Sequence, residues 1–260
     1  MPQEKQEELN VIDLFPEAIR KEEFLVYYQP KVALKDYTLA GAEALCRWLH
    51  DGSLLPPFRF IPIFEQNGQI AELDFYMLDH VCWDMHGWIS KGWKPVRTSV
   101  NLSRVHEMNE KLVADILHII DKNGVPRDLV EIELTETTAD IGFHDLKLVV
   151  GGLSEEGVHT SVDDFGVGYS SLNLISDLPW NMLKIDKGFV PVDGDMQTRH
   201  HVMLKHLINL AGDMGLECLA EGVETVEQVK LLKEAHCMLA QGYFFDKPLP
   251  KAEFETRLVF

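Results

Sequence analysis

Apolar positions follow two periods along this chain, and the two periods alternate. Short runs rich in Val, Ile, Leu and aromatic residues are separated by longer segments in which apolar residues recur at helical spacing. The runs predict eight strands, over residues 24–34, 39–48, 96–103, 130–136, 158–166, 181–187, 216–223 and 238–245. The segments between them include four amphipathic helices, over residues 70–90, 109–124, 201–215 and 226–236. The pattern therefore predicts an α/β fold.

This alternation restricts how the strands can pair. Strands joined through helices run parallel, because only a crossover connection returns the chain to the same end of a sheet. Eight such strands in 260 residues favour a closed (β/α)8 barrel of the TIM type, and an open doubly wound sheet is the weaker alternative. The first two strands are separated only by residues 35–38, so we expect them to pair antiparallel.

Composition narrows the class of partner. With 42 acidic and 24 basic residues the formal charge is −18, and no basic cluster offsets it, so we expect no binding to nucleic acid polymers or anionic membranes. The four cysteines, Cys46, Cys82, Cys218 and Cys237, form no CxxC pair and indicate reduced thiols. The amino terminus is charged where a signal peptide is apolar, and no window reaches the length of a membrane span, which favours a cytoplasmic location.

Polar residues end nearly every predicted strand, where the strands of a barrel converge on one mouth. They are Glu43 with Arg47, Asn101, Glu133 with Glu136, Asp163 with Asp164, Lys184 with Asp186, Glu221 with Glu224, and Gln241. Any one of them could be a turn or capping residue. As a set, the carboxylates would repel one another without cations. Because Mg²⁺ and Mn²⁺ prefer carboxylate and amide oxygens, the set predicts a divalent metal site.

Two stretches sharpen this hypothesis. Asp163 and Asp164 lie where a strand ends and the chain turns, so both carboxylates can reach the mouth and Asp163 could bridge two ions; a capping role is the alternative. Lys184 lies between Leu183 and Ile185 in an apolar run. We therefore expect its ammonium to be buried against the carboxylates, where it could position or activate a metal-bound water.

Seven motifs together resemble the EAL domain, the cyclic-di-GMP phosphodiesterase family. In chain order they read EALCRW, VNLS, ELTET, DDFGVGYSSL, LKIDKGFV, AEGVET and QGYFF, and the resemblance extends from about Phe24 to Leu249. It implies a (β/α)8 barrel with an antiparallel first strand, in which residues 1–22 are an N-terminal extension or the end of a linker and residues 23–260 are the EAL domain. It also implies hydrolysis of cyclic di-GMP to linear 5′-pGpG by a water that two Mg²⁺ or Mn²⁺ ions activate, which would lower a bacterial second messenger.

The resemblance assigns roles to individual residues. The implied metal ligands are Glu43, Asn101, Glu133, Asp163, Asp164 and Glu221. The implied catalytic residues are Lys184, which contacts the attacking water, Glu43, Glu221 and Gln241. The implied substrate contacts are Gln29, Leu45, Arg47 and Asp186, so that Glu43 and Arg47 serve the metal and the substrate and do not pair with each other. Glu136 is implied to anchor the loop 166–172.

Further expectations follow from the same resemblance. No position of the metal or lysine set departs from the active pattern, so an active enzyme is favoured over a non-catalytic receptor for cyclic di-GMP or a barrel enzyme for another phosphate ester. We expect Ca²⁺ to inhibit. We also expect a homodimer formed through the region of the loop 166–172 and, in a longer parent protein, an attached sensor or GGDEF domain.

Overall fold

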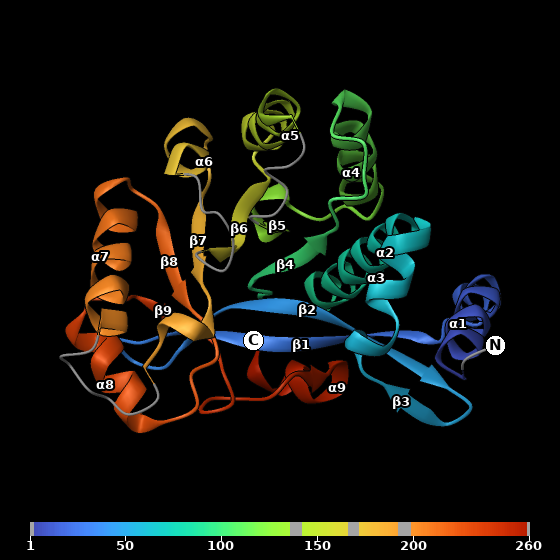
Figure 1. Ribbon diagram of the computed structural model, residues 1–260, viewed down its shortest axis with the longest axis horizontal. Coiled ribbons are helices and arrows are strands. Elements are labelled where there is room, and N and C mark those ends of the chain that lie inside the picture. Colours follow the sequence, from blue (N-terminus) through green and yellow to red (C-terminus); the bar gives the residue numbers. More distant parts are fainter. Residues whose placement is uncertain (1–2, 136–141, 166–171, 192–198, 259–260) are drawn as a thin grey trace.

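Eight strands close into a ring with helices outside it (Figure 1). The computed structural model describes residues 3–135, 142–165, 172–191 and 199–258, and the side chains from residue 11 onward within these ranges. The ring consists of β1 Phe24–Ala33, β2 Leu39–His50, β4 Arg97–Leu102, β5 Val130–Thr135, β6 His159–Phe165, β7 Met182–Ile185, β8 Glu217–Ala220 and β9 Leu239–Ala240. Each of these strands overlaps one of the eight predicted runs, although β9 covers only two residues of the run 238–245. The predicted barrel is confirmed, because β1 pairs with both β2 and β9 and so closes the sheet.

The first strand runs against all the others. β1 pairs antiparallel with β2, with Gln29 opposite Glu43 and Lys31 opposite Gly41, and antiparallel with β9. From β2 to β9 each neighbouring pair of the ring is parallel. The antiparallel first pair expected from the short connection is therefore confirmed.

The helices include the four that the periodicity predicts: α3 Ile70–Ser90, α4 Glu110–Lys122, α7 Arg199–Asp213 and α8 Val226–Glu234. Local chemistry explains their ends. The side chain of Asn109 accepts a hydrogen bond from the Leu112 amide at the start of α4, and Thr225 with Gln228 forms a capping box at the start of α8. Gly124, just beyond α4, has a φ of 65°, a conformation that glycine adopts without strain.

Other elements were not predicted. They are the helices α1 Gln3–Arg20, α2 Ile61–Asn67, α5 Phe143–Glu155, α6 Leu172–Asp177 and α9 Lys251–Phe254, and the outer strands β3 Ser53–Leu55 and β10 Leu249–Pro250. Short 3₁₀ turns span Pro57–Arg59, Arg127–Leu129, Lys187–Phe189 (η4) and Glu255–Arg257. None of the described helices is long and apolar enough to cross a membrane.

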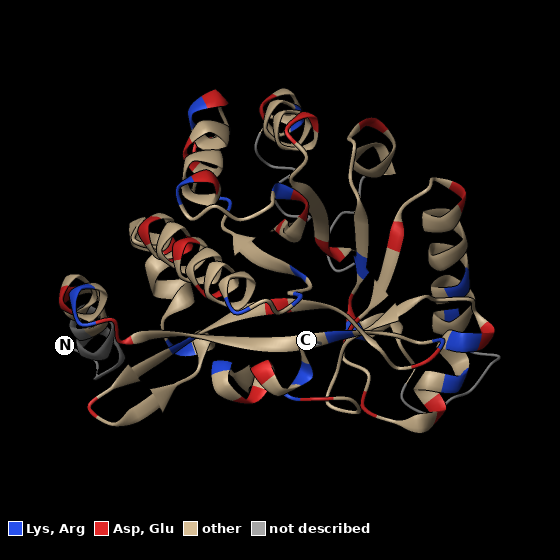
Figure 2. Cartoon of the chain, turned by 180° about the vertical axis from the view of Figure 1, so that it is seen from behind, with Lys and Arg blue, Asp and Glu red and all other residues tan. Residues whose placement is uncertain are grey.

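The interior of the barrel is polar, whereas the apolar core lies between the strands and the helices. Side chains alternate along each strand, so apolar residues such as Val100 and Ile132 pack outward against the helices. Inside the ring, Lys31, Glu131 and Lys184 are buried to 2% exposure or less. Figure 2 shows that charged positions occur on the strands as well as on the helices. A buried charge needs a partner, so the barrel must hold these groups in ion pairs.

The helix α1 covers much of the predicted extension 1–22 and packs on the barrel. Its Phe15 is 1% exposed, and the Phe15 ring centroid lies 4.7 Å from that of Phe64 and 5.7 Å from that of Phe24. The second half of α1 therefore contributes to the core beside the amino end of β1.

This packing predicts a measurable effect on stability. Phe15→Ala should lower the free energy of unfolding by about 3–5 kcal/mol, because it removes a buried ring and leaves a cavity. Chemical denaturation followed by circular dichroism measures the loss. Asp13→Ala, at an exposed position of the same helix, is the control and should change stability by less than about 0.5 kcal/mol. Equal stability of the two variants would show that α1 does not belong to the folded unit.

Candidate active site

A buried lysine lies at the centre of the barrel mouth, among carboxylates from several strands. Lys184, on β7, is 1% exposed. Its Nζ lies 2.7 Å from Glu133 Oε2, 2.8 Å from Glu221 Oε1 and 2.9 Å from Asp163 Oδ1, and 3.8 Å from Glu43 Oε2. The three short contacts match the three donors of an ammonium group. The expectation that Lys184 is buried against the carboxylates is therefore confirmed.

Electrostatics keeps this lysine charged. Burial disfavours the ammonium form of Lys184, but Asp163, Glu133, Glu221 and Glu43 more than offset that effect, and the pKa of Lys184 lies well above its ordinary value.

The glutamates of the cluster differ from one another. Burial would raise the pKa of Glu133, but Lys184 and Lys31 outweigh it and lower this pKa to about 2. Burial raises the pKa of Glu221 to about 8, because Lys184 offsets it only in part. The pKa of Glu43 is also raised, again chiefly by burial. The cluster therefore contains one glutamate held firmly as an anion and two whose charge is disfavoured without a further cation.

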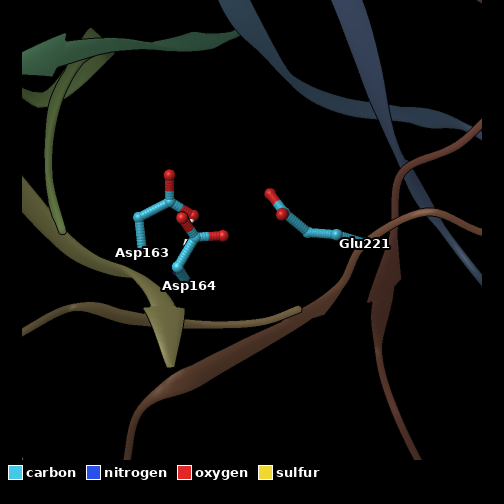
Figure 3. Close-up of side chains that lie close together, drawn as sticks. All are labelled: Asp163, Asp164 and Glu221. Carbon is cyan, nitrogen blue, oxygen red and sulfur yellow. Dashed lines mark hydrogen bonds between the residues drawn. The ribbon is translucent and has the colours of Figure 1, made fainter. Parts of the chain in front are cut away.

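Three carboxylates form a group with the spacing of a metal site. One oxygen from each of Asp163, Asp164 and Glu221 lies within 4.8 Å of the others. Figure 3 shows the two aspartates at the end of β6 and Glu221, just after β8, pointing toward a common space. Asp164 has a φ of 53° and lies in an irregularity of β6 between Val162 and Phe165, so the side chains do not alternate there and adjacent carboxylates reach the same side, as predicted. The donor set is all oxygen, which suits Mg²⁺ or Mn²⁺.

The opposite side of the mouth is built from β1, β2 and the segment after β9. Gln241 Nε2 donates to Glu43 Oε2 at 2.5 Å and to Gln29 Oε1 at 3.1 Å. Asn101 Nδ2 donates to Glu43 Oε1 at 3.2 Å. The Oε1 atom of Gln241 is buried and has no hydrogen-bond partner in the described part of the chain, so it can accept a bond from a ligand. These amides hold the Glu43 carboxylate toward the cluster.

The other predicted site residues in the described part of the chain have contacts of their own. Arg47 donates to the Cys46 carbonyl at 2.8 Å and lies 5.5 Å from the ring centroid of Tyr27, and among the described residues it forms no ion pair with Glu43. A cavity of about 300 Å³ is lined by Leu45 together with Asn101, Asp163 and Asp164, and extends to α2 and α3. The carboxylate of Asp186 accepts from the Gly188 amide at 2.7 Å and caps η4. Glu136 and residues 166–171 lie outside the described residues.

Sequence reasoning missed a second charged layer below the cluster. Lys31 Nζ lies 2.8 Å from Ser99 Oγ, 3.0 Å from Glu131 Oε1 and 3.0 Å from Glu133 Oε1. Glu131 also accepts from Ser161 Oγ at 2.9 Å. The alternation of side chains could have found it, because Glu131 is two residues from Glu133 and so shares its inward face.

A buried pair beside the mouth was also missed. Asp74 Oδ2, on α3, accepts from the Ser103 amide at 2.7 Å and lies 3.0 Å from His106 Nε2. Burial raises the pKa of Asp74. These bonds fix the turn that follows β4, the strand that carries Asn101.

Comparisons with known proteins agree with this architecture. The EAL domain family matches residues 13–248. The signaling protein YkoW of Bacillus subtilis is 34% identical over 254 residues, 96% of this chain and 31% of YkoW. Cyclic di-GMP phosphodiesterase NbdA of Pseudomonas aeruginosa is 36% identical over 253 residues, 97% of this chain and 32% of NbdA. The chain thus spans about a third of the length of these relatives. The solved PaMucR phosphodiesterase in complex with c-di-GMP superposes with a TM-score of 0.87 at 30% identity, covering 94% of this chain and 99% of that one.

The central ion-pair cluster predicts a large effect of removing its cation. Lys184→Met should lower the free energy of unfolding by about 3–5 kcal/mol in the presence of a chelator, because it leaves buried carboxylates without a counter-charge. Thermal and chemical denaturation measure the loss. Lys35→Met, at an exposed position, is the control and should change stability by less than about 0.5 kcal/mol. A Lys184→Met variant as stable as the control would show that the lysine does not hold the cluster together.

Proposed function

Because the chain belongs to the EAL domain family, we propose that it is a phosphodiesterase that hydrolyses cyclic di-GMP to linear 5′-pGpG with two divalent cations. The observation that carries the proposal is the group of carboxylates around Lys184 at the carboxyl ends of the strands, where barrel enzymes hold their active sites. The relative NbdA bears this activity in its name, and the PaMucR phosphodiesterase was solved with c-di-GMP.

The proposed cations are Mg²⁺ or Mn²⁺, held by the predicted ligands. One ion would be bound by Glu43, Asn101, Glu133 and Asp163, and the other by Asp163, Asp164 and Glu221. Two bound ions supply Lewis acidity to the phosphodiester and to the attacking water. A chain of charge −18 needs such cations to receive an anionic substrate.

The side chains of the cluster divide the remaining work. Lys184 would donate to the attacking water when bound cations draw Asp163 and Glu221 away from its ammonium, because in this structure three carboxylates take all three of its donors. Gln241 would keep Glu43 turned toward the ions through its 2.5 Å hydrogen bond. Lys184, on β7, would thus act on the water itself, and Gln241, just after β9, would act through Glu43.

The substrate contacts form a separate set. Arg47 would bind a phosphate oxygen, Leu45 would line the adjoining cavity, and Gln29 and Asp186 would contact the nucleotide.

A role of Glu136 in anchoring the loop 166–172 stays a prediction, as do inhibition by Ca²⁺, the homodimer, a cytoplasmic location, the domain boundary at residue 23 and an attached sensor or GGDEF domain.

The reaction is tested by incubating the purified chain with cyclic di-GMP and Mg²⁺ or Mn²⁺ and separating the products by chromatography. We expect linear 5′-pGpG, and none in excess chelator. Asp163→Asn should reduce kcat by about 100-fold or more, because even residues behind the metal ligands typically change activity 10- to 100-fold. Asp213→Asn, at an exposed position of α7, is the matched control and should keep wild-type activity.

Three results would count against this function. Absence of product with both metals between about pH 7 and 9, where metal-bound water ionises, would exclude the phosphodiesterase. Tight binding of cyclic di-GMP without turnover would instead indicate a receptor. Product formation in excess chelator would exclude the role of the cations.

The role of Arg47 is tested by steady-state kinetics. Arg47→Ala should raise KM for cyclic di-GMP by about 10- to 150-fold with a smaller change in kcat, because a charge-assisted hydrogen bond to a phosphate contributes about 1.5–3 kcal/mol. Arg59→Ala, at an exposed position, should leave both constants unchanged. A fall in kcat at constant KM would assign Arg47 to the chemical step and contradict its proposed role in substrate binding.

A further inference from the structure

The second charged layer lies directly below the proposed metal ligands. We define the lower layer as Lys31, Ser99, Glu131 and Ser161, which come from β1, β4, β5 and β6. Each of the four is 2% exposed or less. The three donors of the Lys31 ammonium are matched by three acceptors at 2.8–3.0 Å, one of which, Glu133 Oε1, belongs to the cluster above.

Glu133 connects the two layers through its two oxygens. Its Oε1 atom receives Lys31 from below at 3.0 Å, and its Oε2 atom receives Lys184 at 2.7 Å. The carboxylate is thus held at both ends by ammonium groups from strands on other sides of the ring. Because Lys184 also contacts Asp163 and Glu221, the Oε2 atom is the one that faces the carboxylate group at the mouth.

The fold makes room for Lys31 at one position of β2. Gly41 lies opposite Lys31 in the register. A Cβ atom at Gly41 would lie 3.4 Å from Lys31 Cδ and 3.1 Å from the Arg97 carbonyl oxygen. The backbone of Gly41 has no positive φ, so a turn does not require glycine here. The absence of a side chain instead lets the Lys31 stem and the Arg97 carbonyl lie close to the Gly41 backbone. The lysine stem therefore crosses the barrel through a space that a larger residue would narrow.

We propose that Lys31 is a positioning residue for the metal site: it holds Glu133 Oε1 from below, so that Oε2 is presented to the cations at the mouth. The inference rests on the proposed function. Partners of this kind orient the ligands of many metal sites, and their loss typically weakens metal binding 10- to 100-fold.

A simpler role for Lys31 is to neutralise Glu131. The two roles predict opposite rankings of two variants by their affinity for the metal. Glu131→Gln keeps the bond from Lys31 to Glu133 but adds one positive charge to the interior. Lys31→Met/Glu131→Gln removes one charge of each sign, so its net charge equals that of the wild type, but Glu133 Oε1 loses its partner.

Mn²⁺ binding by chelator-stripped protein, measured by calorimetry, separates the two roles. The positioning role predicts that the double variant binds Mn²⁺ about tenfold more weakly than the wild type, and more weakly than Glu131→Gln. It also predicts a lower kcat with an unchanged KM for cyclic di-GMP. If Lys31 acts only as a charge, the double variant binds Mn²⁺ like the wild type and more tightly than Glu131→Gln, and the inference is overturned.

A second variant keeps the inference testable if the double variant does not fold. Gly41→Ala retains every charge, but its Cβ atom would lie only 3.1 Å from the Arg97 carbonyl oxygen; β2 and the Lys31 stem in contact with that atom must therefore shift, which should also weaken Mn²⁺ binding. Gly87→Ala is the control, because a Cβ atom there meets nothing within 4 Å. Equal affinities of these two variants would overturn the inference. Absence of Mn²⁺ binding by the wild type would overturn the proposed function and the inference together, whereas wild-type affinity in the double variant overturns the inference alone.

Discussion

The structure depends on one interaction, the insertion of the Lys184 ammonium among carboxylates inside a closed barrel. Glu133, Asp163 and Glu221 come from different strands and would repel one another in a buried site. The lysine contacts all three at 2.7–2.9 Å and makes their burial possible. Because a parallel barrel brings the ends of its strands to one mouth, the same contacts that stabilise the interior also assemble the candidate site.

The reversed first strand extends this arrangement into the barrel. In β1 the residues nearer the mouth come earlier in the sequence, so Gln29 lies opposite Glu43 and Lys31 lies one step deeper, opposite Gly41. The last residues of each parallel strand line the mouth of the barrel, whereas in β1 the residues that line it come before the end of the strand. Lys31 was missed because it lies one layer below the mouth, as does Glu131 on a parallel strand. Gln29 was found only through the resemblance to a family.

The rest of the fold was predictable where the signal was local. Eight strands and four helices follow from periodicity, and burial of Lys184 follows from its apolar neighbours. Helix α5 was missed because Gly151 and Gly152 lower its intrinsic helix propensity. Its formation depends on packing that no local pattern contains: a Cβ atom at Gly152 would lie 3.3 Å from Val113 Cγ2, so the glycine lets α5 approach α4 closely.

The balance of charge explains why this interior suits cations. Among the described residues, two ammonium groups, Lys31 and Lys184, face six carboxyl groups, those of Glu43, Glu131, Glu133, Asp163, Asp164 and Glu221. Glu133 touches both lysines, and its pKa is lowered to about 2. Glu221 touches only Lys184, and its pKa is raised to about 8. The lysines thus compensate the deep carboxylates but leave a deficit of positive charge at the mouth, which disfavours ionisation of Glu221 until a further cation binds. If every carboxylate had a salt bridge to a lysine, the barrel would be stabilised, but little charge would remain for a divalent ion to compensate. The deficit of positive charge at the mouth instead makes the binding of hard cations favourable where the cavity opens.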